Sequence, residues 1–383
     1  MARLFSASPI TKLMNKVGLS SDRIKSSSFL TGLLPSFVPW MPIAFTISIT
    51  TKCNLKCTIC SRTIHGIENM HMSKDMFLKA AKYFNNRSIT ILGAGEPFLH
   101  PNIFEFIQIC QSKNSSVKLV TNGTLLSEEK SKRLLQYPNI ESVTFSIDGV
   151  YENYNKIRVN GDFQTVINNL RRISELKKER NATHPLLSVN FVGMRSNTGD
   201  FPELIKIAGP YTNTITFSHP IIFSQDETNE HLNKNAEFAK RVFKESMEVA
   251  HKCDTELILR SLKPYTGGCI EPWTAPYIGI KGDVYPCCMI GGGDPQKTVV
   301  EYYGDASIIR DVAGYSLGNI MDTDLNQIWN SDKLRQFRKA LSKVNAVDLK
   351  RKYNGDIYVE MMRKWTPSTF YCKLCPYRWN CAC

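Results

Sequence analysis

The 383-residue sequence contains no uninterrupted apolar run long enough to cross a membrane. Its most apolar stretch, residues 29–45, contains Pro35, Pro39 and Pro42, which interrupt a spanning helix. Residues 1–25 are basic but lack the continuous apolar core and the small-residue cleavage site of a signal peptide. We therefore expect no transmembrane segment and a cytoplasmic location, where thiols stay reduced.

Acidic residues are in deficit, with 35 Asp and Glu against 48 Lys and Arg, which gives a net charge of +13. The basic residues are dispersed along the chain, and no stripe alternates them with aromatic residues. This pattern is more typical of solvated helix faces than of a nucleic-acid interface, although it leaves nucleic-acid binding open. A basic surface favours anionic partners, such as an acidic reductase or a phosphorylated substrate.

Internal repeats are also absent, and what the chain does contain is an alternation of β-rich and helix-like segments. The predicted strands are residues 43–50, 88–92, 117–122, 142–148, 186–194 and 214–219. The predicted helices between and after them are 73–85, with Ser73 as N-cap, 103–112, 127–137, 163–180, 201–209 and 229–252. Six strand–helix units predict parallel strands in a partial, TIM-like (β/α)6 barrel, because a full barrel needs two more.

The pattern changes after residue 262, where Gly, Pro and Cys become dense. Residues 277–280 and 284–287 flank Lys281-Gly282-Asp283, which predicts a β-hairpin, and residues 325–341 have helical spacing. We therefore divide the chain into an N-terminal arm (1–42), an α/β barrel (43–262) and a small cysteine-rich α+β domain (263–383).

The twelve cysteines form two tight groups and a pair, which favours metal binding over a disulfide framework. Cys53, Cys57 and Cys60 have the spacing C-x3-C-x2-C directly after the first predicted strand. Three thiolates hold three irons of a [4Fe–4S] cluster and leave the fourth iron open to a small molecule. Structural zinc, with His65 as the fourth ligand, is the alternative.

This cysteine spacing after a strand resembles that of the radical S-adenosylmethionine (radical SAM) superfamily. The resemblance extends to Gly93-Ala94-Gly95-Glu96-Pro97, Thr121-Asn122-Gly123-Thr124 and Ser146-Ile147-Asp148-Gly149, each at a predicted strand end, and to Arg158. It implies SAM contacts from Gly95, Glu96, Asn122, Ser146, Asp148 and Arg158. In the family the Gly-Gly-Glu motif holds the SAM amine, and the arginine pairs with the SAM carboxylate. Taken singly, each piece could be an ordinary turn, cap or surface residue. Ala94 and Ile59 depart mildly from the family pattern.

The C-terminal cysteines resemble those of the SPASM/twitch extension of radical SAM enzymes, which carries auxiliary [4Fe–4S] clusters. The predicted metal ligands are Cys53, Cys57, Cys60, Cys269, Cys287, Cys372, Cys375 and Cys381. One auxiliary cluster on Cys269, Cys287, Cys372 and Cys375 is the economical interpretation, and two clusters or a zinc ribbon remain open. Cys110 and Cys253 lie in apolar helical patterns and are predicted to be small buried hydrophobic residues.

The resemblance implies that an external one-electron reductant, of flavodoxin or ferredoxin type, supplies the electron that cleaves SAM to a 5′-deoxyadenosyl radical. The radical then takes a hydrogen atom from an unactivated carbon. A net oxidation of a small molecule or sugar, with the auxiliary cluster as electron acceptor, is our first expectation, since residues 1–42 are short for a peptide-recognition domain. The alternatives are a maturase acting on a peptide or protein side chain and a non-catalytic iron–sulfur or zinc protein that binds nucleic acid. The sequence identifies no catalytic acid or base.

Overall fold

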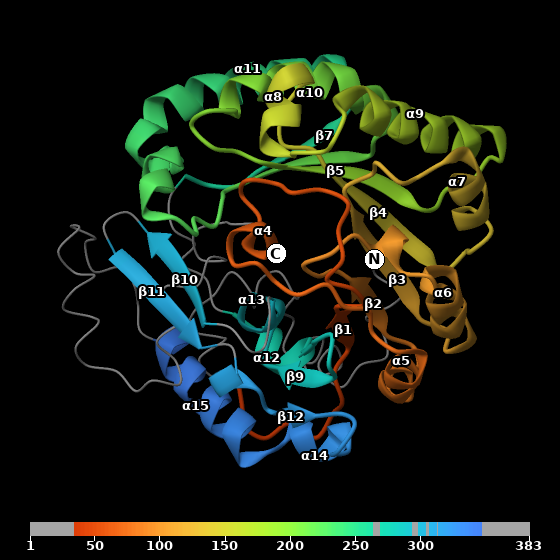
Figure 1. Ribbon diagram of the computed structural model, residues 1–383, viewed down its shortest axis with the longest axis vertical. Helices are drawn as coiled ribbons and strands as arrows, with labels where there is room; N and C mark the ends of the chain where they lie inside the picture. Colours follow the sequence, from red (N-terminus) through yellow and green to blue (C-terminus); the bar gives the residue numbers. More distant parts are fainter. Residues whose placement is uncertain (1–33, 263–268, 293–297, 304–305, 312, 347–383) are drawn as a thin grey trace, which may run out of the picture.

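The computed structural model describes residues 34–262, 269–292, 298–303, 306–311 and 313–346. Within them ten strands form one sheet in the order β12-β9-β8-β1-β2-β3-β4-β5-β6-β7 (Figure 1). The parallel part consists of β1 (Ala44–Ile47), β2 (Ser88–Ile91), β3 (Ser116–Thr121), β4 (Ile140–Ser146), β5 (Leu186–Val192), β6 (Thr214–Ser218) and β7 (Glu256–Leu259). Each of these strands is parallel to the next, and the strand order follows the chain order. The predicted partial TIM-like barrel is confirmed.

In the described part of the chain, six main helices connect the parallel strands, and they lie around the outer side of the curved sheet (Figure 1). They are α5 (Lys74–Ala81), α6 (Ile103–Ser112), α7 (Glu128–Leu134), α9 (Phe163–Glu179), α10 (Phe201–Ala208) and α11 (Ala236–Lys252). Short helices α4 (Ser61–Ile64) and α8 (Tyr151–Ile157) and the 3-10 helices η1 (Pro97–Leu99), η2 (Thr198–Asp200), η3 (Gly209–Tyr211), η4 (Gln225–Glu230) and η5 (Leu232–Asn235) fill the loops. Ser73 caps α5 as expected, because its hydroxyl accepts a hydrogen bond from the Met76 N–H.

The parallel strands alternate in burial, although strands of parallel sheets are usually apolar on both faces. Ile89, Leu119 and Val189 are buried on the face that packs against the helices. Their neighbours on the other face are small and polar, as at Thr90 and Ser188, and remain half-exposed. The inner face of the open barrel is therefore polar and partly accessible rather than filled by a closed apolar core.

Two sequence expectations need correction. The six predicted strand–helix units are present, but the sixth helix is followed by an additional parallel strand, β7, which the sequence did not reveal; its Glu256 and Ile258 are exposed, so it has no buried alternating pattern. The helix expected over 325–341 is divided into α14 (Leu325–Trp329) and α15 (Asp332–Ala346). The apolar spacing continues across this break, so it could not reveal it.

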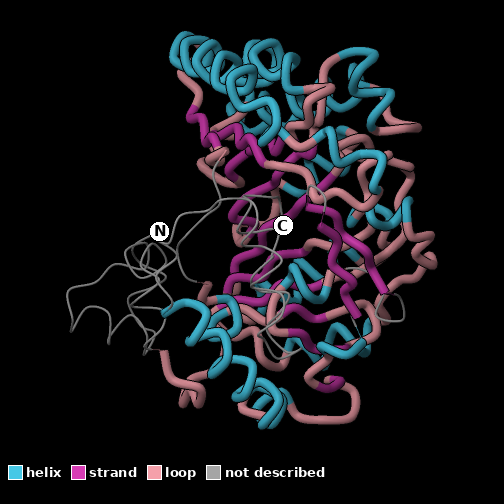
Figure 2. Tube along the Cα trace, turned by 90° about the vertical axis from the view of Figure 1, so that its left-hand side faces the viewer, coloured by secondary structure: helices cyan, strands magenta, loops and turns pink. Residues whose placement is uncertain are grey.

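The C-terminal region extends the same sheet. β8 (Tyr277–Ile278) pairs in parallel with β1 and antiparallel with β9 (Asp283–Tyr285), and β9 pairs with β12 (Gly318–Asn319). The predicted hairpin is confirmed, and its turn needs a glycine because Gly282 has φ +89°. The remaining elements are α12 (Glu271–Thr274), α13 (Cys288–Gly291), η6 (Ala313–Tyr315) and the separate antiparallel pair β10 (Thr298–Tyr303) and β11 (Ala306–Asp311). In Figure 2 the strands run through the middle of the molecule, with helices above and below them.

Residues 34–41, which we call the N-terminal strap, lie on the C-terminal region. The last residue of α14 and the residue after it bond the main chain of the strap. Asn330 Oδ1 accepts from the Val38 N–H at 3.1 Å, and Asn330 Nδ2 donates to the Val38 carbonyl at 2.8 Å. The Trp329 indole donates to the Trp40 carbonyl at 2.9 Å. The Trp273 indole donates to the Pro35 carbonyl at 2.6 Å. This part of the expected arm is therefore packed against the cysteine-rich region. The domain limits at 42/43 and 262/263 stay predictions.

None of the helices in the described ranges is long and apolar enough to cross a membrane.

Candidate SAM and iron–sulfur site

The C-x3-C-x2-C loop follows β1 at the carboxyl edge of the parallel sheet. Two main-chain hydrogen bonds attach it to the end of α8 and the residues just after it, from Thr58 N to Ile157 O and from Lys56 N to Val159 O, both 2.9 Å. Cys60 is the residue before α4, so the third thiol lies at the start of a helical turn. The loop is thus held between β1 and the end of α8, and its three thiols are half-buried.

The thiols lie close enough to influence one another and receive hydrogen-bond donors from the chain. Cys53 Sγ accepts from the Leu55 N–H at 3.4 Å and from Asn122 Nδ2 at 3.8 Å. Burial raises the pKa of Cys57 to about 12, and the neighbouring Cys60 and Cys53 add to this while Arg158 opposes it. Without a cation the Cys57 thiol stays protonated, whereas bound iron would deprotonate it. N–H donors to cysteine sulfur are among the features that set the reduction potential of an iron–sulfur cluster.

A single metal ion fits this arrangement less well. Among the described residues, no three His, Cys, Asp or Glu side chains converge closely enough to hold one ion. A cubane cluster instead takes each thiolate on a different iron, so its ligands are spread around a larger centre. The three thiols are therefore better suited to a cluster. The alternative, a zinc ion bound with His65 as fourth ligand, has no preformed site among the described residues.

The glycine-rich loop after β2 packs directly on the cysteine loop. A Cβ on Gly95 would lie 2.5 Å from the carbonyl oxygens of Thr50 and Lys52, so only glycine fits there. The next N–H, of Glu96, donates to the Lys52 carbonyl at 2.8 Å. This close approach fixes the end of β2 against the loop that carries Cys53.

Glu96 is 1% exposed, and its carboxylate is occupied by the protein itself. It accepts hydrogen bonds from the Asn122 N–H at 2.7 Å, the Thr121 hydroxyl at 2.8 Å and the Phe98 N–H at 3.1 Å. Burial raises the pKa of Glu96, while these donors oppose the shift. In the structure, the Glu96 carboxylate therefore links the ends of β2 and β3. Direct contact between Glu96 and the SAM amine stays a prediction.

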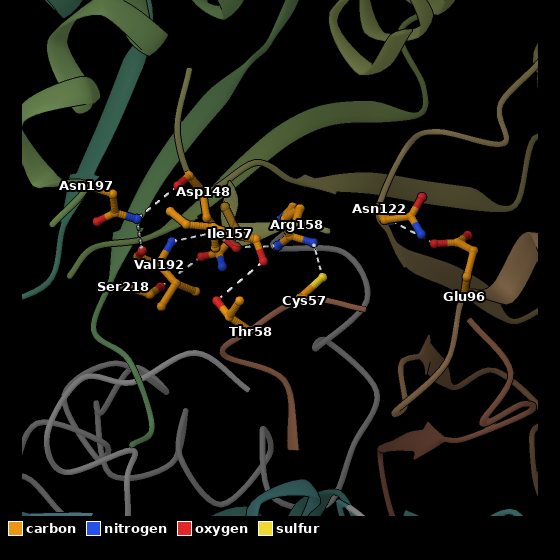
Figure 3. A network of polar contacts seen from close by, with 11 residues as sticks. Cys57, Thr58, Glu96, Asn122, Asp148, Ile157, Arg158, Val192, Asn197 and Ser218 are labelled. Carbon is orange, nitrogen blue, oxygen red and sulfur yellow. Dashed lines mark hydrogen bonds and ion pairs between the residues drawn. The ribbon is translucent and has the colours of Figure 1, made fainter. Parts of the chain in front are cut away.

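Asp148 and Arg158 form a buried ion pair of 2.6 Å between Oδ2 and Nη2 (Figure 3). Arg158 Nη1 also lies 3.9 Å from Cys57 Sγ. Burial lowers the pKa of Arg158, but Asp148 and Cys57 outweigh it and the net shift is upward. Arg158 therefore connects the end of β4 to the cysteine loop, and its buried Nε has no hydrogen-bond partner. A role for that guanidinium toward the SAM carboxylate stays a prediction.

The sequence did not reveal the hydrogen bonds that hold Asp148 in place from β5 and the loop after it. The Val192 N–H donates to Asp148 Oδ1 at 2.9 Å, and Asn197 Nδ2 donates to the Asp148 and Val192 carbonyls, each at 2.9 Å (Figure 3). Asn197 lies 49 residues from Asp148 and has no motif around it. Ser146, the remaining predicted contact, ends β4 half-exposed and is in register with Asn190 of β5.

The C-terminal ligands can be placed only in part. Cys269 and Cys287 belong to one apolar cluster, in which Cys287 is buried and Cys269 packs against it together with Cys288. The predicted ligands Cys372, Cys375 and Cys381, with Cys383, lie outside the described residues. Cys110 is fully buried as predicted, and Cys253 is half-buried at the end of α11.

The fold and this site are those expected of a protein that binds an iron–sulfur cluster at the carboxyl edge of an open α/β barrel. Residues 47–208 match the family described as the radical SAM superfamily, and residues 269–355 match the SPASM iron–sulfur cluster-binding domain. The chain belongs to the radical SAM superfamily and carries a SPASM domain. Its cofactors are [4Fe–4S] clusters and SAM; a reduced cluster would supply the one electron that cleaves SAM to methionine and a 5′-deoxyadenosyl radical.

Three curated relatives illustrate what the chain is similar to. It is 24% identical over 299 residues to the tungsten-containing aldehyde ferredoxin oxidoreductase cofactor-modifying protein of Pyrococcus furiosus, covering 76% of this chain and 82% of the relative. It is 25% identical to the antilisterial bacteriocin subtilosin biosynthesis protein AlbA of Bacillus subtilis, covering 78% and 62%. It is 34% identical to a probable GTP 3′,8-cyclase of Methanocaldococcus jannaschii, covering 42% and 53%, so it spans about half of that relative.

Among solved structures, SuiB of Streptococcus suis is similar with a TM-score of 0.58 at 16% identity. The match covers 78% of this chain and 68% of that protein. This likeness supports the fold.

Proposed function

We propose that this chain is a maturase that abstracts a hydrogen atom from a carbon of a peptide or protein side chain. The similarity that carries the proposal extends over both domains: AlbA, a bacteriocin biosynthesis protein, matches 78% of the chain. The GTP 3′,8-cyclase matches only 42%. The original expectation of a small-molecule oxidation is therefore the weaker of the two.

The inner face of the barrel is consistent with a polar, extended substrate. Along β5 and β6 the half-exposed positions include Ser188, Asn190 and Thr216. Hydroxyl and amide groups of this kind can bond the main chain of a peptide without selecting one side chain. The two ends of the described sheet, β7 and β12, are not paired with each other, so the barrel is open.

The chain's own residues would orient the reactants and exclude water. Cys53, Cys57 and Cys60 would hold the SAM-binding cluster, and Arg158 would keep one of these thiolates charged. In the auxiliary domain Cys269 and Cys287 would hold part of a second cluster, which can take up one electron from the substrate. An external reductant of flavodoxin or ferredoxin type stays part of the proposal.

A second candidate is modification of a cofactor. The Pyrococcus furiosus protein named as cofactor-modifying matches 76% of the chain, also across both domains. This candidate is close to the oxidation of a small molecule and would leave peptides untouched.

The test is anaerobic reconstitution with iron and sulfide, followed by dithionite, SAM and a pool of synthetic peptides that together present all side chains. Mass spectrometry measures 5′-deoxyadenosine and each peptide. A maturase predicts a SAM-dependent loss of two hydrogen atoms from particular peptides, absent in Cys60→Ala and retained in Cys110→Ala. Deoxyadenosine formation with every peptide unchanged would contradict the peptide proposal and favour the cofactor candidate.

A further inference from the structure

His219 follows β6 directly and is 2% exposed. Its Nε2 lies 3.0 Å from the Ser261 carbonyl and 3.4 Å from the Arg260 carbonyl. Both neighbours are acceptors, so Nε2 carries the hydrogen and Nδ1 presents a lone pair.

Nδ1 of His219 is buried and has no hydrogen-bond partner. A buried acceptor left without a donor is unfavourable, and such groups are rare in folded proteins. Burial lowers the pKa of His219, and the Ser261 and Arg260 carbonyls oppose this only in part. The imidazole therefore stays neutral near pH 7 and is suited to accept a hydrogen bond rather than to take up a proton.

The adjacent strand end supplies a complementary donor. Arg260 follows β7, which pairs with β6, and its main-chain N–H bonds the Phe217 carbonyl at 3.2 Å. Its half-buried guanidinium has a buried Nε without a partner. An unused acceptor and an unused donor thus occur at neighbouring strand ends.

These groups lie at the same edge as the SAM site. Ser218, which precedes His219, donates to Asn190 Oδ1 at 2.8 Å, and Asn190 is in register with Ser146. Ser218 also lies beside Val192, whose N–H bonds Asp148 (Figure 3). The pair therefore continues the polar edge from the SAM contacts toward β7.

We propose that Nδ1 of His219 and Nε of Arg260 form a substrate subsite that binds one peptide group, its N–H to His219 and its C=O to Arg260. A carboxylate would leave His219 without a donor, and a lone ether or ketone oxygen would do the same. An amide satisfies both atoms, as an alcohol hydroxyl also would, and the proposed peptide substrate selects the amide. The inference rests on the proposed peptide substrate and adds where that substrate is held.

The first test needs no turnover. Ring-nitrogen NMR of the reconstituted, [15N]histidine-labelled enzyme would follow Nδ1 of His219, assigned by its absence in His219→Gln, as N-methylacetamide or acetate is added. A shift with the amide that is lost in Arg260→Lys supports the subsite. No shift with the amide, or a shift with acetate alone, overturns it.

The second test uses a peptide that the screen shows to be modified. Gln at position 219 can keep the donor to the Ser261 carbonyl and lacks the Nδ1 acceptor, so the KM for the peptide should rise about tenfold with kcat and the KM for SAM unchanged. His184→Gln, at an exposed histidine, is the matched control. An unchanged peptide KM, or an equal change in the KM for SAM, overturns the proposal. If no peptide is modified, the maturase proposal fails, while the NMR result still decides the subsite.

Discussion

Arg158 lies between a carboxylate and a cysteine: its Nη2 is 2.6 Å from Asp148 Oδ2 and its Nη1 is 3.9 Å from Cys57 Sγ. One side chain thus neutralises a fully buried acid and donates to a predicted cluster ligand. The planar, forked guanidinium can serve both partners at once, which an ammonium group cannot.

Replacing Arg158 with Gln should destabilise the protein by about 3–5 kcal/mol, because Asp148 is left buried without its partner. Chemical denaturation measures this difference. Asp148→Asn combined with Arg158→Gln should recover part of the loss, since the uncompensated charge is gone. If the double variant is no more stable than the single one, the buried pair does not explain the effect.

Replacing Arg158 with Lys should make the reduction potential of the SAM-binding cluster more negative. Hydrogen bonds to cluster sulfur stabilise the reduced state, and Lys cannot reach both partners. A redox titration followed by electron paramagnetic resonance measures the shift. Arg172→Lys, on the exterior helix α9, is the control, and an unchanged potential in Arg158→Lys would show that the contact with Cys57 is electronically unimportant.

The sequence allowed the sheet, most of its helices and the edge that bears the site to be predicted, because alternating segments and strand-end motifs are local signals. It could not show that the Glu96 carboxylate would accept hydrogen bonds from Thr121 and Asn122, because side-chain partners depend on how the strand ends meet in space. Asn197 was missed for the same reason. The break at Asn330 was missed because the apolar spacing continues across it, and the bonding of the Asn330 side chain to Val38, 292 residues away, leaves no local signal.

Cys60 and Cys110 offer a direct test of which cysteines bind iron. With one auxiliary cluster, the reconstituted enzyme should hold about eight irons, Cys60→Ala about four, and Cys110→Ala about eight. The reason is that Cys60 is in the cysteine loop while Cys110 is fully buried in α6 among apolar residues. Iron analysis and 5′-deoxyadenosine assays measure the result. Equal iron loss in both variants would contradict the assignment of Cys60 as a ligand.

Glu96→Gln should weaken SAM binding without removing iron. The amide keeps one acceptor oxygen but places an NH2 group against a donor, so the link between the ends of β2 and β3 is broken at a cost of about 1–3 kcal/mol. Equilibrium binding of SAM to the reconstituted enzyme measures the change. Glu129→Gln, at an exposed position of α7, should leave binding unchanged. A normal affinity in Glu96→Gln would show that the carboxylate does not organise the site.

Acid should destabilise the fold through a buried histidine. Burial lowers the pKa of His231 to about 4, from 6.5, and the nearby His219 adds to the effect. Between pH 6.5 and pH 4 the unfolded chain therefore binds more protons, so stability falls by about 3 kcal/mol as the pH decreases through this window. Thermal unfolding followed by tryptophan fluorescence should show a shallower decline in His231→Asn. His184→Asn should behave as the parent, and an identical pH profile in all three proteins would contradict the assignment.

The N-terminal strap should contribute to the stability of the SPASM region through Asn330. Asn330 Nδ2 donates to the Val38 carbonyl, and its Oδ1 accepts from the Val38 N–H and from Arg338 Nη1. Asn330→Asp keeps the acceptor and loses the donor, so it should destabilise the region by about 1–2 kcal/mol, and Asn330→Ala by more, because Arg338 then loses a partner in a buried position. Denaturant unfolding and the rate of proteolysis within the strap measure these effects. Gln327→Ala, exposed on α14, is the control.

Loosening the strap should also reduce the iron that the auxiliary domain retains, because Trp273 bonds the same strap and lies four residues after Cys269. Full iron retention together with faster proteolysis would show that the strap has a structural role only.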